Sequence, residues 1–315
     1  MEQFSVRRFL LLVLLGSQLY THCGVLEKWY AASFFFFDTL CEVNLFTSYD
    51  HFLSAQEDIH RIFTDINTSF SPEAKDYSSQ AVLALFRKAY ILHQASDGAF
   101  DITIAPLSRL WGFLDGNHRV PEFKPIKKTL QLIGMDKIRD QKTFLDLPEG
   151  MSLDWGGIAK GYGIDVAARI LKESGIAKGF INAGGDLYCW GKNPSGTSWK
   201  IGIKHPRKEG FIGVLEIRDL GAATAGDYQR FFIHDGIRYH HIFNPKTGYP
   251  AQGKQSVTVV GPEALLCDAL STALFVSLHP EAILEKYPDY GAVIVDSDGT
   301  LSILGKEYPL SLSSF

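Results

Sequence analysis

The hydrophobic pattern near the start of the chain changes from a continuous run to a helical spacing. Residues 34–46, FFFFDTLCEVNLF, are rich in aromatic and β-branched side chains, which predicts a strand that enters the core. In residues 59–66 and again in 82–89, apolar side chains stand three and four positions apart, as on one face of a helix. We therefore expect a strand followed by two amphipathic helices.

The second half of the chain is dominated by short strand patterns. The runs WKIGI, GVLEI, RFFIH, YHHIF and SVTVV are separated by Gly, Pro and Asp turn residues, and one helix around 263–278 interrupts the strands. The Asp298–Gly299 pair near the end predicts a hairpin. Helices and strands thus segregate instead of alternating, which favours an α+β fold over a doubly wound parallel sheet.

Composition excludes several classes of protein. The 315 residues are 46% hydrophobic, enough for a large core, and no repeat, low-complexity tract or long linker divides them. The 31 basic and 35 acidic residues form no basic block, so nucleic acid is not expected as a partner. Cys41, Cys189 and Cys267 are scattered without CxxC spacing, which indicates neither a disulfide framework nor a zinc site.

Residues 1–22 predict an export signal. Two arginines precede the apolar run Phe9–Leu15, which is shorter than the ~20 residues of a membrane-spanning helix. Cys23 follows, and a cysteine at this place suggests bacterial lipoprotein processing, in which the acylated thiol tethers the mature chain to a membrane. Residues 19–22, LYTH, fit the usual small-residue preference poorly, and an uncleaved anchor is the alternative. We expect one mature catalytic or binding unit over residues 23–315.

A glycine-rich stretch, DWGGIAKGYG, occupies residues 154–163. Apolar residues recur every fourth position from Ile158 onward, so the stretch predicts a loop that leads into a helix. Glycines at a helix N-terminus let a phosphate approach free N–H groups, and Lys160 would add positive charge. The alternative is a tight turn whose glycines only let the helix pack on a sheet. Neither the P-loop nor the dinucleotide fingerprint is matched.

Three oxygen-bearing side chains share one face of the helix expected at 263–278. Asp268, Ser271 and Thr272 stand at positions i, i+3 and i+4. Magnesium takes oxygen ligands, commonly one or two carboxylates together with substrate phosphates. The alternative is structural: Asp268 would complement the helix dipole, and Thr272 would bond back to the carbonyl of residue 268.

Three further segments carry candidate chemistry. The glycine pair in INAGGDLYCWG, residues 181–191, indicates a close approach of the backbone to a ligand or another strand. HHIFNPKTGYP, residues 240–250, places two histidines before a rigid turn that could aim one of them. The apolar stretch at 97–113 is interrupted by Asp101 and Arg109, and either walls a flat ligand or forms ordinary core.

Together these segments resemble the ApbE family of FAD:protein FMN transferases. The matching motifs are GAFDITIAPLSRLWGF, LDWGGIAKGYGIDVA, INAGGDLYCWG, TAGDYQRFF, HHIFNPKTGYPA and CDALSTALFV, in the family's order from Phe34 to Leu304. The resemblance implies a two-lobed unit with mostly antiparallel sheets and an active site in the cleft. It also implies that FAD and Mg²⁺ are bound, and that FMN is joined by a phosphoester to a Ser or Thr of a target protein while AMP leaves.

The same resemblance assigns roles to residues and to partners. Recipients would be membrane redox subunits of the sodium-pumping quinone reductase or Rnf type, with the enzyme exported and anchored at the periplasmic side of a bacterial inner membrane. His241 would assist removal of the hydroxyl proton, and Asp227 of the GDY element is a weaker FAD candidate. The implied metal ligands are the Gly157 carbonyl, Asp268, Ser271 and Thr272, with Asp268 also catalytic; the implied FAD contacts are Phe37 (in FDT, at the family's MGT-like position), Ala99, Phe100, Asp101, Asp154, Lys160 and Phe243.

Two departures from the family pattern leave questions open. The segment FSPEAKDYSSQ, residues 70–80, replaces an SExSRLN-like segment, which puts a flavin contact there in doubt. Asn244 stands where the family commonly has Asp, which removes a charge beside His241. An FAD pyrophosphatase that uses water as acceptor, and a flavin-binding lipoprotein without turnover, are the alternative functions.

Overall fold

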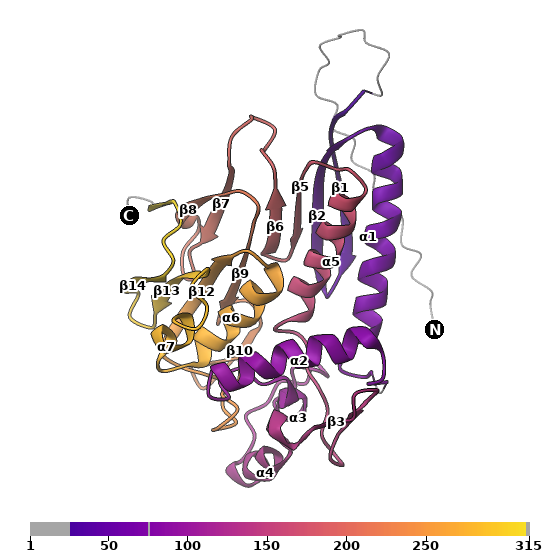
Figure 1. The fold of residues 1–315 in the computed structure, drawn as a ribbon. Coiled ribbons are helices and arrows are strands. Elements are labelled where there is room, and N and C mark those ends of the chain that lie inside the picture. Colours follow the sequence, from indigo (N-terminus) through magenta and orange to yellow (C-terminus); the bar gives the residue numbers. More distant parts are fainter. Residues whose placement is uncertain (1–25, 75, 313–315) are drawn as a thin grey trace.

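The computed structural model describes residues 26–74 and 76–312, so the predicted export signal and Cys23 lie outside the described residues. No helix in these two ranges is long and apolar enough to cross a membrane. Within the same ranges an antiparallel sheet of eight strands forms the centre of the molecule (Figure 1). Its strands lie in the order β1 (Lys28–Phe36), β2 (Thr39–Thr47), β5 (Lys178–Ala183), β6 (Asp186–Trp190), β9 (Leu220–Gly226), β12 (Lys254–Gly261), β13 (Gly291–Asp296) and β14 (Leu301–Gly305).

Both faces of this sheet are covered, because its strands alternate apolar side chains between two cores. On one face the helices α1 (Tyr49–Ser69), α5 (Ala159–Glu173) and α6 (Ala264–Val276) bury the largest core. On the other face a second core lies under a smaller antiparallel sheet. The strands of the smaller sheet follow the order β15 (Leu310–Leu312), β8 (Phe211–Ile217) and β7 (Trp199–Lys204).

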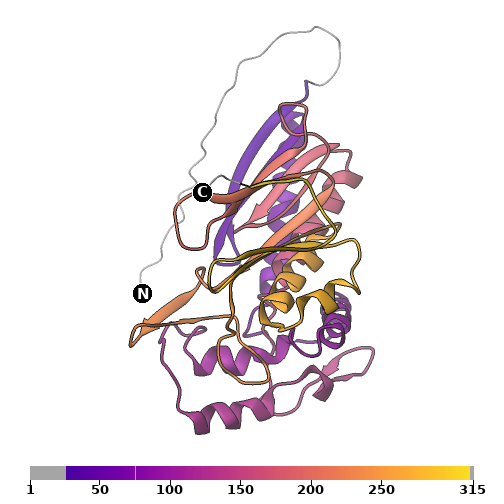
Figure 2. The ribbon, with the colours of Figure 1, turned by 90° about the vertical axis from the view of Figure 1, so that its left-hand side faces the viewer.

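A third group of elements lies below the sheet in Figure 1. Around α3 (Ala105–Leu110) and α4 (Phe123–Thr129) it buries a separate aromatic core, in which the Trp111 indole N–H donates a 3.0 Å hydrogen bond to the carbonyl of Gly248, whereas α2 (Gln80–Ala95) packs into the largest core. Figure 2 shows the hairpin β10–β11 projecting from this part of the molecule. The group comprises α2, α3 and α4 together with η1 (Ile102–Ile104), η2 (Leu130–Leu132), η3 (Met135–Lys137), β3 (Arg139–Asp140), β4 (Leu145–Asp146), β10 (Phe231–His234) and β11 (Ile237–His240); α7 (Pro280–Leu284) follows α6.

The α+β fold with antiparallel sheets is confirmed, and the hairpin at Asp298–Gly299 joins β13 to β14 as expected. The single strand predicted over 34–46 is wrong. Phe37 and Asp38 both have positive φ, 54° and 56°, so the chain turns back there and the run splits between β1 and β2. Only the start of YHHIF is a strand, because β11 ends at His240.

Candidate functional site

A buried cluster of charges lies where α5 approaches α6 and the start of β6. The Lys160 ammonium donates to the carbonyl of Gly156 at 2.9 Å and lies 3.0 Å from an Asp186 carboxylate oxygen and 3.5 Å from one of Asp268. Both carboxylates are almost fully buried. Two negative charges thus surround one positive charge in a region that water hardly reaches, so the cluster has an excess of negative charge.

The electrostatics of the cluster favour a bound cation. Burial raises the pKa of Asp268, and the charge of Asp186 raises it further, while Lys160 lowers it. Burial alone would lower the pKa of Lys160, but the two carboxylates hold it above its usual range. The ammonium therefore stays charged, and additional positive charge near Asp268 would relieve the repulsion between the carboxylates.

The backbone of Gly157 faces the hydroxyl of Thr272. A Cβ placed on Gly157 would lie 3.1 Å from Thr272 Oγ1 and 3.5 Å from a ring carbon of Phe100. Thr272 Oγ1 makes no hydrogen bond to any residue in the described ranges, so the back-bond considered for Thr272 is not formed. Ser271 makes that kind of bond instead, its Oγ donating to the carbonyl of Asp268 at 2.8 Å. The Thr272 hydroxyl is therefore left available.

Two local contacts fix α6 against α5. A Cβ on Gly161 would lie 2.4 Å from the carbonyl oxygen of Ala264, so only glycine allows this close approach. Asp165 of α5 accepts the backbone N–H groups of Ala264 and Leu265 at 2.9 Å each and so caps the first turn of α6. Burial raises the pKa of Asp165 to about 6. These contacts set the position of Asp268 relative to Lys160.

The loop before α5 is shaped by its own carboxylate. Asp154 accepts the N–H of Gly156 at 2.9 Å through one oxygen and the hydroxyl of Ser108 at 3.0 Å through the other. Its backbone N–H donates to the carbonyl of Ile102 at 2.7 Å, which joins this loop to the segment that follows Phe100. Asp154 therefore lies next to the cluster and holds the glycines in place.

The segment 99–101 approaches the cluster through Phe100, which is buried against Gly157. Asp101 is also buried, which raises its pKa, and its carboxylate accepts the backbone N–H and the hydroxyl of Thr103. Ala99 is half-buried beside them. Asp101 thus shapes its own loop, and the predicted contacts of this segment with FAD stay predictions.

The two aromatic residues assigned to the flavin lie in different environments. Phe37 is half-buried at the β1–β2 turn, with its ring 5.3 Å from that of Phe63. Phe243 is only 2% exposed and packs between the rings of Trp111 and Phe113. Phe37 is therefore placed at the surface near α5, whereas the ring of Phe243 belongs to the third core.

His241 follows β11 and is partly buried. Its Nδ1 donates to the carbonyl of Arg230 at 3.2 Å, which leaves Nε2 as the acceptor nitrogen. Burial lowers the pKa of His241 to about 3, and the charges of Arg230 and Lys160 contribute to the lowering. The imidazole is therefore neutral at pH 7. Asn244 Oδ1 accepts the N–H groups of Lys246 and Thr247, so the amide shapes the turn.

Two residues at or beside the site were not predicted from the sequence, and one of the predicted candidates forms an ion pair with another residue. Asp186 was not selected as a site residue. The available signal was its place directly after the glycine pair of INAGGD, where the backbone was expected to approach a ligand closely. Asp165 gave no signal, because its role depends on a contact with a helix almost 100 residues later. Asp227 forms a bidentate ion pair with Arg207 at 2.7 and 2.5 Å.

The donors at the cluster fit a hard divalent cation. Among the described residues, no group of three or more His, Cys, Asp or Glu side chains could hold a metal. The available donors are instead the Asp268 carboxylate, the Thr272 hydroxyl and the Gly157 backbone, a set made only of oxygen. Mg²⁺ prefers this set and commonly completes it with substrate phosphates.

Comparison with known proteins gives a consistent picture. The ApbE family profile matches residues 37–294. An FAD:protein FMN transferase of Haemophilus influenzae is 31% identical over 256 residues, which span 72% of this chain and 73% of that protein. One of Vibrio cholerae is 32% identical over 245 residues, spanning 70% and 72%.

Solved structures agree. The ApbE protein of Thermotoga maritima superposes with a TM-score of 0.82 at 30% identity, covering 88% of this chain and 97% of that one. The flavin transferase ApbE of Vibrio cholerae gives a TM-score of 0.78 at 26% identity, covering 89% and 98%. The match over 37–294 contains the whole charge cluster between α5, β6 and α6. The chain therefore belongs to the ApbE family.

Proposed function

We propose that this chain is a Mg²⁺-dependent FAD:protein FMN transferase. It joins the FMN half of FAD to a Ser or Thr hydroxyl of a target protein and releases AMP. The observation that carries the proposal is the meeting of Lys160, Asp268, Thr272 and the Gly157 backbone between α5 and α6. A cation site and a fixed ammonium next to a glycine loop are what a pyrophosphate needs for binding.

The reaction is a displacement at phosphorus. The acceptor oxygen forms a bond to the FMN phosphorus, the bond from that phosphorus to the bridging oxygen breaks, and AMP leaves with that oxygen. Negative charge grows on the phosphoryl oxygens and on the leaving phosphate, so positioning and charge stabilisation dominate catalysis. Lys160 supplies a positive charge that the backbone of Gly156 and the Asp186 carboxylate hold in one place.

The metal would be held by Asp268, Thr272 and the Gly157 carbonyl, with Ser271 adjacent. Bound there, Mg²⁺ would neutralise charge on the phosphate oxygens. The Ser271 hydroxyl donates a hydrogen bond to the Asp268 carbonyl, so it is directed back toward its own helix.

The hydroxyl proton needs an acceptor. His241 is neutral at pH 7 and has Nε2 free because Nδ1 donates to Arg230. Its lowered pKa makes it a weak base, so it suits a step in which the proton moves late, after the phosphorus bond to the leaving group has weakened. We assign His241 this role as part of the proposal.

The location and the recipients belong to the same proposal. An N-terminal export signal with Cys23 as the acylation site would anchor the enzyme to the periplasmic side of the inner membrane. There it would meet flavin-carrying subunits of the sodium-pumping quinone reductase or Rnf type. Mass spectrometry of such subunits, with and without this protein, would detect the added FMN.

Asp268→Ala tests the proposal at its centre. The parent should transfer FMN to a recombinant recipient subunit only when Mg²⁺ is present, and the variant should lose at least a hundredfold in rate, about 3 kcal/mol of barrier. The variant should keep its fold by circular dichroism. Unchanged transfer by the variant would remove Asp268 from the site. AMP release without any labelled recipient would indicate a pyrophosphatase, and FAD binding without AMP release would indicate a binding protein.

A further inference from the structure

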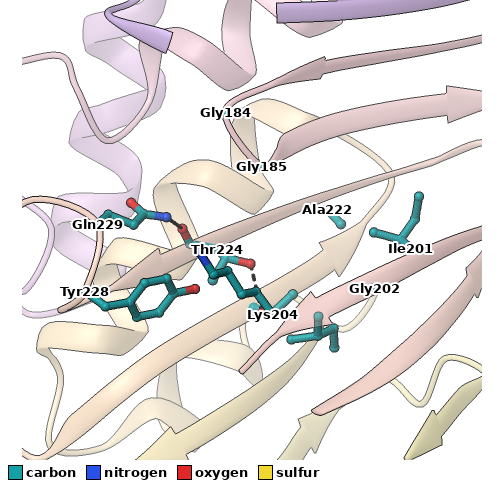
Figure 3. Close-up of a pocket in the computed structure, with 11 residues that line it drawn as sticks. Gly184, Gly185, Ile201, Gly202, Lys204, Ala222, Thr224, Tyr228 and Gln229 are labelled. Atoms are coloured by element: carbon teal, nitrogen blue, oxygen red, sulfur yellow. Dashed lines mark hydrogen bonds between the residues drawn. The ribbon is translucent and has the colours of Figure 1, made fainter. Parts of the chain in front are cut away.

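A cavity of about 200 Å³ lies on the face of the central sheet opposite α5 and α6. Figure 3 shows its lining, with Lys204, Thr224, Tyr228 and Gln229 gathered beside the Gly184–Gly185 turn. Typical small-molecule sites measure ~300–1,000 Å³, so this cavity is small for a dinucleotide. It is large enough for one or two side chains of a longer partner.

One wall of the cavity is an edge strand. Four consecutive residues of β7, from Ile201 to Lys204, line it. Among the described residues β7 pairs only with β8, so its other edge carries backbone N–H and C=O groups without a strand partner. An extended peptide can add to such an edge, taking affinity from main-chain hydrogen bonds and specificity from side-chain pockets.

The floor of the cavity is polar, and a lysine gives the cavity positive charge. The hydroxyls of Thr224 and Thr258 share a 2.9 Å hydrogen bond, and Gln229 donates to the carbonyl of Thr224 at 3.0 Å. The ammonium of Lys204 lies 5.7 Å from the centre of the Tyr228 ring. Of the described residues that line the cavity, Lys204 is the only charged one. A carboxylate on the partner would complement it.

The cavity borders the active centre through one turn. Gly184 and Gly185 line the cavity, and the next residue, Asp186, carries the carboxylate that lies 3.0 Å from the Lys160 ammonium. On the same face of the sheet, and beside this turn, the cross-strand pair Phe35 and Leu40 is 72% and 54% exposed. The N–H of Gly184 donates to the Leu40 carbonyl at 3.2 Å.

From these observations we propose that the cavity binds the acceptor protein. An extended, acidic segment of the acceptor pairs with the free edge of β7, places a carboxylate near Lys204, and contacts the apolar pair Phe35 and Leu40. The Ser or Thr of the acceptor that receives FMN then extends past the Gly184–Gly185 turn, so that its hydroxyl lies near the phosphates. This inference rests on the proposed transferase function and names where that function recognises its protein substrate.

Lys204→Glu tests the inference, with Lys200→Glu as the matched control. Both lysines are exposed on β7, but Lys200 pairs with Glu216 and does not line the cavity. The probe is a recombinant flavin-carrying subunit titrated at saturating FAD and Mg²⁺. Lys204→Glu should raise KM for this subunit about tenfold, with kcat within about twofold of the parent. Lys204→Arg, which keeps the positive charge, should have the KM of the parent, and so should Lys200→Glu.

The affinity for FAD, measured by flavin fluorescence, separates the rival uses of the cavity. We expect the same FAD dissociation constant for the parent and for Lys204→Glu. A weaker FAD affinity in the variant would assign the cavity to the dinucleotide and overturn the inference, as would an unchanged KM for the subunit. If the parent transferred FMN to no subunit, the proposed function would fall and this inference with it. If the parent labels the subunit but the KM for the subunit does not depend on Lys204, only the inference about the cavity is overturned.

Discussion

The close approach of α5 and α6 at Gly161 predicts a measurable coupling between packing and activity. In Gly161→Ala the new Cβ would lie 2.4 Å from the Ala264 carbonyl oxygen and 2.7 Å from the Leu265 Cα. Carbon and oxygen atoms in contact are normally about 3.3 Å or more apart. The two helices must therefore separate by about 1 Å at this point, and both carry residues of the charge cluster.

The size of the effect follows from opposing terms. Overpacking costs about 1–3 kcal/mol, whereas alanine in a helix is about 1 kcal/mol better than glycine. We expect a net loss of up to about 2 kcal/mol and a fall in Tm of up to about 6 °C. The rate should fall much more, about a hundredfold, because a displacement of about 1 Å in the positioning of reacting groups has that effect.

Gly163→Ala in the same helix is the matched control. Its Cβ would find the nearest side-chain atoms of Ile66, Phe37 and Phe63 at 3.4–3.6 Å, which is ordinary contact. This variant should gain about 1 kcal/mol of stability and keep the parent's rate within about twofold. Calorimetry and single-turnover AMP release at saturating FAD and Mg²⁺ measure both quantities. If the two variants lost the same fraction of activity, the reasoning from the α5–α6 contact would be refuted.

Two further predictions concern buried carboxylates. The pKa of Asp165 is raised by burial from 3.8 to about 6, so its ionisation opposes folding, and the stability it gives is lost as pH rises through about 6. Relative to Asp165→Asn, the free energy of unfolding of the parent, measured by denaturant titration, should fall by up to about 3 kcal/mol between pH 4 and 6.5. A difference between the two proteins that does not change with pH would contradict this. In Asp186→Asn, Lys160 keeps only Asp268 as a carboxylate partner and competes for it with a cation. The Mg²⁺ concentration for half-maximal transfer should rise about tenfold, and an unchanged Mg²⁺ requirement would argue against a role for Asp186.

Local patterns predicted the elements that carry the site. The spacing of apolar residues in 59–66 and 82–89 gave α1 and α2, because each of these helices packs one side against the core. The helix predicted around 263–278 is α6, and nearly all of its residues are buried. The glycines of 154–163 were expected to lead into a helix, and α5 begins at Ala159. Gly161 does serve close packing, but against helix α6 and not against a sheet as the alternative supposed, while Gly157 faces the Thr272 hydroxyl.

Contacts between distant segments could not be predicted from spacing. The turn at Phe37–Asp38 uses two non-glycine residues with positive φ, so no glycine or proline marked the end of β1. Apart from Leu220 and Thr224, strand β9 consists of glycine and alanine, which lack the strand signal of branched and aromatic side chains. The pairing of Lys160 with Asp186 depends on the position of β6 beside α5, which only the assembled sheet provides.

The start of β6 connects the two faces of the central sheet. Asp186 points to the helix face, where it holds Lys160, while Gly184 and Gly185 line the cavity on the opposite face. A peptide bound along β7 would press on this turn, whose backbone has φ of 64° and 106° and so depends on glycine. Any shift of the turn would move the carboxylate nearest the ammonium. Binding of the acceptor and the electrostatics of the phosphate site are therefore expected to be coupled, so acceptor binding should alter FAD affinity in the parent and much less in Lys204→Glu.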